Sequence, residues 1–370
     1  MKKLLTLLLA VVMCLSVMSA FAEGVDYSAI PDTITSSDGT YAIAFVTDVG
    51  QLKDKSFNEG TWNGVKDYAS ANGLTYKYYQ PANGNQATDD DRFDAMKAAA
   101  DAGAKVIVCA GFMQGGALAK AAAAYPEVKF VFIDGWAFDD LKNTVGVAYK
   151  EEQCGYFAGY AVVRDGFTKL GFAGGGGGTN PACMRYGYGF IQGANQAAAE
   201  MGVQVEIKFS WAYGASFSPS PELQTLMNGW YENGTEIVFS CGGSMFASVT
   251  AAASANDGFV VGVDVDQSYE SDTVLTSALK GLAEGTEWAV AKAFDGTWDE
   301  IGGTAVSLGV ADDAVGLPVD TWSLEVYTVE EYEALKAAVA AGEIVIDDQA
   351  AEGDPNAKGP WSNVTVDYVK

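Results

Sequence analysis

Acidic residues beside one apolar run are the first sign of chemistry in this sequence of 370 residues. Asp264 and Asp266 stand two positions apart, and Lys280 follows the next apolar run, where it can balance Asp264. Paired carboxylates can bind Ca²⁺ or Mg²⁺, supply the two acids of a glycosidase, or accept hydrogen bonds from the vicinal hydroxyls of a sugar. The spacing lacks the other ligands and the glycine of an EF-hand loop, so we expect no metal. A structural ion pair at a hinge explains the same residues nearly as well.

A second group of candidates lies between residues 46 and 58. Asp54 or Ser56 can cap a helix that begins near residue 58, which would be a purely structural role. Capping does not need the large aromatic side chain of Phe57, whose ring could instead stack on a flat ligand. The structural and the functional interpretation of this segment carry about equal weight.

Two loops later in the chain are rich in glycine and aromatic residues. The glycines at 174–178 resemble a phosphate cradle, but they lack the context of G-x-G-x-x-G and the Gly-Lys-Ser/Thr of a P-loop. We therefore expect a turn that lets the backbone approach a ligand or a facing lobe. A loop with Gly and Pro holds Trp211, Tyr213 and Phe217, whose rings either pack as a lid or close on a ligand opposite Phe57.

The composition excludes several classes of protein. The absence of histidine excludes Ser-His-Asp and Cys-His nucleophile systems, an imidazole base and His-liganded zinc. A formal charge of −26 would repel phosphates, so we expect no nucleic-acid partner. No C-x-x-C pair occurs among the cysteines after residue 22, which argues against a zinc site or a thioredoxin-like motif. We also expect no cofactor. These cysteines are Cys109, Cys154, Cys183 and Cys241.

Residues 1–22 have the pattern of a signal peptide, with Lys2 and Lys3, an apolar run, and small residues up to Ala22. Cleavage after Ala22 would remove two lysines and no acid, which takes the formal charge from −26 to −28. A lipid on Cys14 is the less favoured alternative, because Met13 stands where a small residue is expected. No later apolar run reaches the length of a membrane span, so we expect an exported protein.

Strands and helices are expected to alternate after a polar leader at residues 23–40. Strands of about six residues and helices of about ten to fourteen predict an α/β fold with parallel sheets covered on both faces. The pattern starts again near residue 151, which predicts two facing lobes. The expected division is 41–148 plus about 273–300 for the first lobe, 149–266 plus about 304–350 for the second, and 351–370 for a tail.

Ligands of open parallel sheets bind beyond the carboxyl ends of the strands. The residues that follow the predicted strands are therefore site candidates. They are Asp48, Gln80, Gly111, Phe112, Asp134, Gly174, Trp211, Cys241, Gly242, Gly243 and Asp264. Acids, aromatics and glycines dominate this set and no nucleophile stands beside a base, which favours binding over catalysis.

Several motifs occur in order between Val46 and Lys280. They include VTDVG at 46–50, DKSFN at 54–58, FID at 132–134, EQCGYFAGY at 152–160, GVDVDQ at 262–267 and VLTSALK at 274–280. In these motifs the chain resembles the basic membrane protein (Bmp) family of ABC-transporter substrate-binding proteins, whose better-understood members are purine nucleoside receptors. The resemblance implies the type I periplasmic-binding-protein fold, with two doubly wound parallel-sheet lobes joined by a multi-crossover hinge.

The resemblance also implies roles for individual residues. Phe57 and Phe217 would sandwich a base, with Met245 or Phe246 as the fallback for the second ring. Asp134 would hydrogen-bond the polar edge of the base. Asp264 and Lys280 would hold the ribose hydroxyls. The remaining expected site residues are Asp48, Asn58, Gly111, Phe112 and Gly242.

We therefore expect a monomeric, extracytoplasmic substrate-binding protein that delivers a purine nucleoside, or a similar neutral ligand, to an ABC permease in the membrane. The strong negative charge disfavours nucleotides. Two alternatives stay open: a binder of a free sugar or a flavin-like ring, and a carboxylate-based nucleosidase or glycosidase that uses Asp264 and Asp266.

Overall fold

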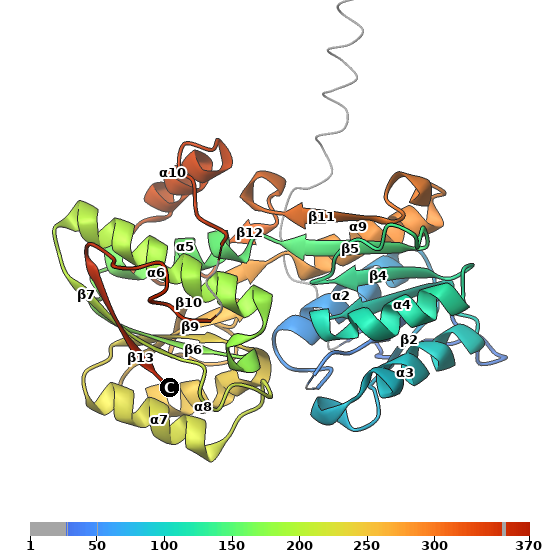
Figure 1. The fold of residues 1–370 in the computed structure, drawn as a ribbon, viewed down its shortest axis with the longest axis horizontal. Coiled ribbons are helices and arrows are strands. Elements are labelled where there is room, and N and C mark those ends of the chain that lie inside the picture. The colour runs from blue at the N-terminus through green and yellow to red at the C-terminus, as the bar shows by residue number, and fades with distance from the viewer. Residues whose placement is uncertain (1–26, 28, 50, 350–352) are drawn as a thin grey trace, which may run out of the picture.

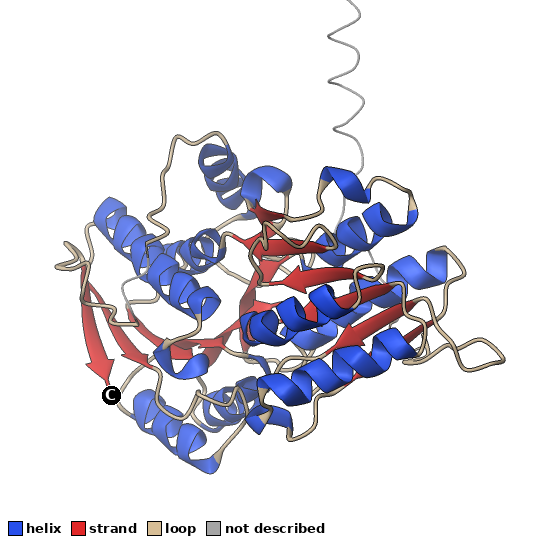
Figure 2. Ribbon diagram, turned by 45° about the vertical axis from the view of Figure 1, so that its right-hand side comes forward, coloured by secondary structure: helices blue, strands red, loops and turns tan. Residues whose placement is uncertain are grey.

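The computed structural model describes residues 27, 29–49, 51–349 and 353–370. The expected signal peptide, with Cys14, and residues 23–26 and 28 of the expected leader lie outside the described residues. In the described part, two β-sheets with helices on both faces form two lobes side by side (Figure 1 and Figure 2). This arrangement confirms the α/β fold that the alternating pattern predicts.

The first sheet has six strands in the described chain, in the order β11-β5-β4-β3-β1-β2, and all neighbouring strands are parallel. Its central strands are apolar and buried at every position, because helices cover both of its faces. The strands are β1 (Ile43–Val46), β2 (Tyr76–Tyr79), β3 (Val106–Ala110), β4 (Lys129–Ile133), β5 (Thr144–Tyr149) and β11 (Thr304–Leu308).

The second sheet has seven described strands, in the order β12-β10-β9-β8-β6-β7-β13. Its pairs are parallel except for β12, which runs antiparallel to β10. The strands are β6 (Lys169–Gly174), β7 (Val205–Ser210), β8 (Ile237–Cys241), β9 (Phe259–Asp264), β10 (Val274–Lys280), β12 (Val315–Gly316) and β13 (Val364–Val369).

The helices of each lobe fall on two faces. In the first lobe, α2 and α9 share one apolar cluster, and α3 and α4 share another. In the second lobe, α5, α6 and α10 pack on one face, and α7 and α8 on the other. The helices are α2 (Phe57–Ala71), α3 (Asp89–Asp101), α4 (Gly115–Ala124), α5 (Glu151–Arg164), α6 (Pro181–Met201), α7 (Pro221–Glu232), α8 (Phe246–Ala255), α9 (Leu282–Phe294) and α10 (Val329–Ala340). Short 3₁₀ helices occur at Gly84–Gln86, Phe112–Gln114, Gly176–Gly178, Gly243–Met245, Trp298–Glu300 and Val310–Asp312.

The starts of the helices are encoded locally. α6 and α7 each begin with a proline, whose missing N–H is not needed in the first turn. The preceding Asn180 and Ser220 cap these helices, because their side-chain oxygens accept from the N–H of Cys183 (3.0 Å) and of Leu223 (3.1 Å). α5 and α6 then pack so closely that a Cβ on Gly155 would lie 2.0 Å from the carbonyl oxygen of Tyr186. This contact sets the position of the side chains at the start of α6.

The lobes share a strand order, β5-β4-β3-β1-β2 in the first and β10-β9-β8-β6-β7 in the second. Numbered within each lobe and read from the other edge, this is 2-1-3-4-5, the doubly wound order in which ligands bind where the order of the strands reverses. The reversal lies between β1 and β3 in the first sheet and between β6 and β8 in the second. The fold therefore places two binding edges opposite each other.

The chain passes between the lobes three times within residues 51–349: after β5, after β10, and between β11 and β12. The expected division of the chain needs correction here. The sequence pattern predicts that residues from about 273 belong to the first lobe, but β10 belongs to the second sheet. The pattern also predicts that residues from about 304 belong to the second lobe, but β11 joins the first sheet. In the expected tail, β13 pairs with β7 and completes the second sheet. A strand pattern shows where a strand lies but not which sheet edge it joins.

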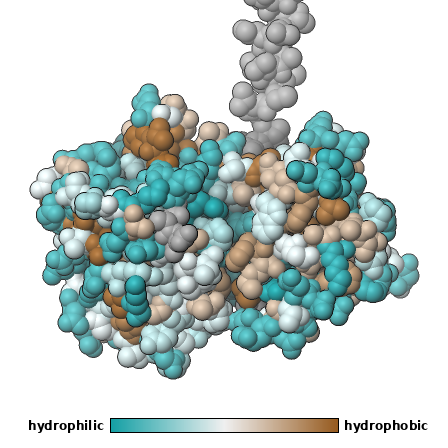
Figure 3. Space-filling model, in the orientation of Figure 1, coloured by the Kyte–Doolittle hydropathy of each residue, from teal (hydrophilic) through white to brown (hydrophobic). Residues whose placement is uncertain are grey.

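The face of the molecule in Figure 3 is largely hydrophilic, as the acidic composition predicts, with apolar side chains gathered over α10. None of the helices in the described ranges is long and apolar enough to cross a membrane. Within the same ranges, no group of three or more His, Cys, Asp or Glu is arranged to hold a metal ion.

Candidate functional site

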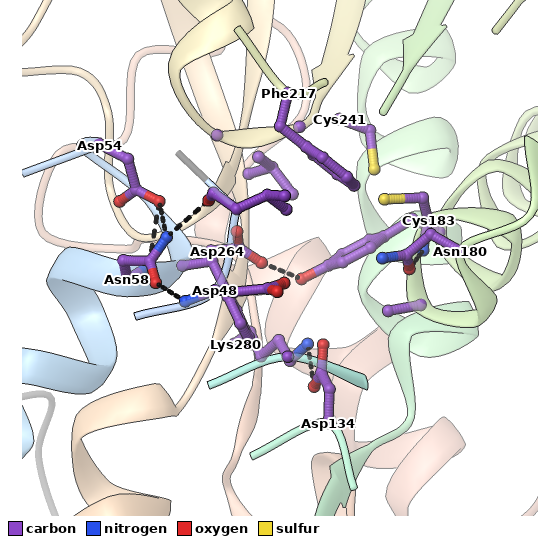
Figure 4. A pocket seen from close by; sticks show the side chains of 18 of the residues that line it. Asp48, Asp54, Asn58, Asp134, Asn180, Cys183, Phe217, Cys241, Asp264 and Lys280 are labelled. Atoms are coloured by element: carbon purple, nitrogen blue, oxygen red, sulfur yellow. Dashed lines mark hydrogen bonds and ion pairs between the residues drawn. The ribbon is translucent and has the colours of Figure 1, made fainter. Parts of the chain in front are cut away.

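A cavity of about 580 Å³, a volume that includes open space at its mouth, lies between the two lobes (Figure 4). The walls come from loops that follow strands in both sheets and from the first turns of α2 and α6. The lining residues are Asp48, Val49, Asp54, Phe57, Asn58, Gly111, Asp134, Asn180, Ala182, Cys183, Tyr186, Phe217, Cys241, Gly242, Gly243, Ser244, Val263, Asp264 and Lys280.

The first turn of α2 forms one side of the cavity, and Asp54 organises it. The Asp54 carboxylate accepts hydrogen bonds from the backbone N–H of Ser56 (3.0 Å), Asn58 (3.0 Å) and Glu59 (3.1 Å). Asp54 also accepts from Asn58 Nδ2 (2.9 Å), and Asn58 Oδ1 accepts from the N–H of Asp48 (2.8 Å). Asp54 is therefore the residue that caps α2. Ser56 remains available for a contact with the other lobe.

Asp48 follows β1 and presents a carboxylate at the cavity (Figure 4). Its Oδ1 is buried without a hydrogen-bond partner among the described residues. Burial raises the pKa of Asp48 to about 7. Gly111 makes room for this carboxylate, since a Cβ there would lie 2.0 Å from Asp48 Oδ2 and its φ is +90°. A buried acceptor without a partner is costly, so Asp48 is suited to bind a donor group of a ligand.

Lys280 lies in a buried cluster of charges at the hinge. Its Nζ contacts Asp134 Oδ1 at 2.6 Å and Glu151 Oε1 at 3.0 Å, and Glu151 also pairs with Arg185 Nε at 2.6 Å. Burial raises the pKa of Asp134 to about 6 despite Lys280, whereas Lys280 and Arg185 overcome burial and lower the pKa of Glu151. The expectation that Lys280 pairs with Asp264 is wrong, because the ion pairs go to Asp134 and Glu151.

Asp264 is instead held by two hydroxyl groups. Ser56 Oγ donates to Asp264 Oδ2 at 2.5 Å across the lobes, and Tyr186 OH donates to Asp264 Oδ1 at 3.2 Å. Asp264 is the last residue of β9 and Asp134 directly follows β4, the corresponding strand of the first lobe; both have positive φ, 68° and 56°. Such backbone conformations cost energy for non-glycine residues and occur preferentially at functional sites.

Aromatic rings from the two lobes complete the lining. Phe57 opens α2 in the first lobe, and the Lys280 ammonium lies 5.1 Å from the centre of its ring. Phe217 belongs to the loop before α7 in the second lobe and has a φ of 56°. The glycine loop supports this ring, because a Cβ on Gly175 would lie 2.3 Å from it. The glycines therefore permit close packing of aromatic side chains on the backbone.

The expected site residues converge with one exception. The cavity lining includes Asp48, Phe57, Asn58, Gly111, Asp134, Phe217, Gly242, Asp264 and Lys280. Phe112 begins a 3₁₀ helix, is only half-buried, and does not contribute to the lining within the described part. Met245 and Phe246, the fallback stacking residues, are buried in the core of the second lobe instead.

Sequence reasoning missed the residues that reach the cavity from α6. Tyr186 and Cys183 lie inside the helix pattern, where no strand end signals them. Cys241 also lines the cavity, as the strand-end rule predicts, although the family resemblance implies no role for it. Within the described residues, Asp264 lines the cavity and Asp266 does not. The Asp266 carboxylate instead accepts a hydrogen bond from Thr321 Oγ1 at 2.6 Å. The carboxylate pair of a glycosidase is therefore not assembled by these two aspartates.

Two doubly wound lobes around a shared cavity, lined by aromatic and acidic side chains, define a solute-binding protein of the periplasmic type. The chain belongs to the Bmp family, because the model of that family, described as ABC transporter substrate-binding protein PnrA-like, matches residues 42–350. Family members are substrate-binding proteins, and they are extracytoplasmic. The chain is thus the substrate-binding protein of an ABC transporter system, a class that implies a small-molecule ligand and a permease as partners.

Known relatives agree with this assignment. The ABC transporter nucleoside-binding protein BmpA of Lactococcus lactis is 27% identical over 306 residues, covering 76% of this chain and 83% of that protein. Basic membrane protein B of Borreliella afzelii is 27% identical over 297 residues, covering 77% and 82%. Among solved structures, a solute-binding protein of an ABC transporter system from Aeropyrum pernix superposes with a TM-score of 0.68 at 22% identity, covering 83% of this chain and 94% of its own. Another from Conexibacter woesei reaches 0.64 at 19% identity, covering 84% and 99%.

Proposed function

We propose that the cavity binds a purine nucleoside, or a similar neutral molecule with a flat ring and hydroxyl groups, and that the closed protein delivers it to an ABC permease. The observation that carries the proposal is that Phe57 and Phe217, one from each lobe, line the same cavity as the carboxylates of Asp48, Asp134 and Asp264. The L. lactis relative, which is described as nucleoside-binding, supports the same ligand class.

Each polar group of the cavity has a role in this proposal. Asp48 accepts a hydrogen bond from a ring or exocyclic N–H, since its Oδ1 has no partner in the described chain. Asp264 accepts from a ribose hydroxyl while Ser56 and Tyr186 hold the carboxylate in place. Lys280 has three N–H donors, of which two meet Asp134 and Glu151, so the third can serve a ligand oxygen.

The charges in the cavity favour a neutral ligand. Four carboxylates line the cavity, those of Asp48, Asp54, Asp134 and Asp264. Among the described residues, Lys280 is the one basic residue that lines it. A phosphate would face several carboxylates at low effective dielectric, where like charges repel strongly. A nucleoside or sugar carries no such penalty, and its hydroxyl groups can donate to carboxylates.

A ligand that contacts both lobes stabilises the closed form, because only that form makes both sets of contacts. Direct contacts across the lobes already exist, such as Ser56 with Asp264 and Lys280 with Asp134. The closed form is then the species that a permease recognises.

We further propose that the protein is monomeric, performs no chemistry on its ligand, and is exported with cleavage after Ala22 rather than lipidation of Cys14. Mass spectrometry of the mature N-terminus distinguishes these two processing routes.

Calorimetric titration with inosine, guanosine, adenosine, ribose and riboflavin tests the ligand class. We expect the nucleosides to bind and Phe57→Ala to weaken them about 5- to 150-fold, since stacking on an aromatic ring contributes about 1–3 kcal/mol per base. Phe112→Ala is the matched control, because this ring lies outside the lining within the described part and should leave the affinity unchanged. Binding of ribose or riboflavin with no response to any nucleoside would overturn the proposal. Release of free base from bound nucleoside would show an enzyme instead.

A further inference from the structure

Two thiols meet in the wall of the cavity. Cys183 lies in the first turn of α6 and Cys241 is the last residue of β8. The two sulfur atoms face each other in Figure 4, and burial together with the neighbouring Cys183 thiol raises the pKa of Cys241. Both cysteines are free, and both line the cavity. The cap by Asn180 fixes the backbone at Cys183, so the approach of the two thiols is built into the start of α6.

The cavity is the route by which a reagent would reach these sulfurs. Cys183 is 7% exposed and Cys241 is 1% exposed, and the cavity is the space that both side chains border. The other described cysteines are placed differently. Cys109 is packed in the core of the first lobe and Cys154 in the contact between α5 and α6, and neither lines the cavity in the described chain.

The proposed ligand contacts use neither thiol, so this pair needs its own explanation. We propose that Cys183 and Cys241 are a redox-active pair that closes reversibly to a disulfide, in exchange with a small disulfide that enters the ligand cavity. Extracytoplasmic proteins meet oxidising conditions in which such bonds form and persist. The residues sit on two different elements, so the bond would join the start of α6 to the end of β8 beneath the loop of Phe217.

The exchange has two steps. The thiolate of Cys183, the more exposed residue, attacks one sulfur of the small disulfide and releases one equivalent of its thiol. The Cys241 thiolate then attacks the mixed disulfide at Cys183 and releases the second equivalent. Two protein S–H bonds and one S–S bond are replaced by one protein S–S bond and two small-molecule S–H bonds. The protein therefore loses two protons and two electrons, and the small disulfide gains both.

The test uses the reduced, ligand-free mature protein with 2-hydroxyethyl disulfide as the probe. Intact mass should fall by two hydrogens, and non-reducing peptide mapping should join the peptides of Cys183 and Cys241; dithiothreitol should reverse both. Cys183→Ser and Cys241→Ser should each prevent the cross-link, whereas Cys154→Ser should retain it. No cross-link under these conditions, or one that joins Cys154 or Cys109, would overturn the proposal.

A second measurement tests the placement of the pair in the ligand cavity, and this part rests on the proposed function. Inosine at ten times its Kd should slow the oxidation about tenfold, because about nine-tenths of the cavities are then filled. Inosine that binds in calorimetry without slowing the oxidation would refute the placement. If inosine does not bind at all, the proposed ligand fails while the cross-link in the ligand-free protein still decides on the thiol pair.

Discussion

Asn85 makes a direct bridge from the first lobe to the loop that carries Phe217, and its removal tests how far the protein itself closes the cavity. Asn85 Nδ2 donates to the carbonyl oxygen of Ser216 at 3.1 Å and to Ser218 Oγ at 2.9 Å. These acceptors flank Phe217 on both sides. The bridge therefore holds the second aromatic ring in place and exists only when the lobes are together.

The magnitude follows from these two hydrogen bonds. Each contributes a net of about 0.5–1.5 kcal/mol, and Asn85 is half-buried, so the bridge should favour the closed form by about 1–2 kcal/mol. Asn85→Ala should then raise the Kd of a bound nucleoside about 5- to 30-fold. The change should appear mainly as faster dissociation, because the bridge must break before the ligand leaves.

Stopped-flow fluorescence or surface plasmon resonance measures both rates. Asn83→Gly is a suitable control, since Asn83 bonds Asp91 within its own lobe and its φ of 66° suits glycine. A double-mutant cycle with Ser218→Ala should show coupling between Asn85 and Ser218, because their side chains bond directly. Equal dissociation rates for the wild type and Asn85→Ala would refute the bridge as a determinant of closure.

Three further predictions concern the cavity. The raised pKa of Asp48, about 7, means that the folded protein keeps a proton which the unfolded chain releases, so the free energy of unfolding of the ligand-free protein should fall as pH rises from about 4 to 7. Asp48→Asn should flatten this slope in urea denaturation, and an unchanged slope would contradict the burial of a free carboxyl. Lys280→Met should lower the free energy of unfolding by about 3–5 kcal/mol, because it removes the buried cation that both Asp134 and Glu151 contact and leaves Glu151 with Arg185 alone; a loss below about 1 kcal/mol would argue against the cluster. Gly111→Ala should weaken nucleoside binding at least about tenfold by displacing the Asp48 carboxylate, whereas Gly39→Ala, with a similar φ and nothing within 4 Å of the added Cβ, should not.

The secondary structure could be predicted because its causes are local. Buried strands are continuous apolar runs, as in Val106–Ala110, and helix starts carry proline and capping residues, as at Asn180–Pro181. The membership of β10, β11 and β13 in their sheets could not be predicted in the same way. Strand pairing depends on which sheet edge is free when the chain recrosses, and that is a property of the whole fold.

The same distinction holds for the cavity. The strand-end rule correctly brought Asp48, Asp134 and Asp264 together, since parallel strands end at one edge of a sheet. It could not assign the partner of Lys280, because Asp134, Glu151 and Asp264 are all acids near the hinge and their distances depend on how the lobes close.

The sequence by itself determined the absence of histidine chemistry, the acidic character, the two repeated α/β units and the family. These follow from residue types, their period and their order along the chain. Only the tertiary structure decided that Asp48 Oδ1 is buried without a hydrogen-bond partner in the described part of the chain, that Tyr186 and Ser56 hold Asp264, and that the Cys183 and Cys241 thiols face each other. These contacts join residues that are far apart in sequence, and burial and hydrogen bonding act on neighbours in space rather than along the chain.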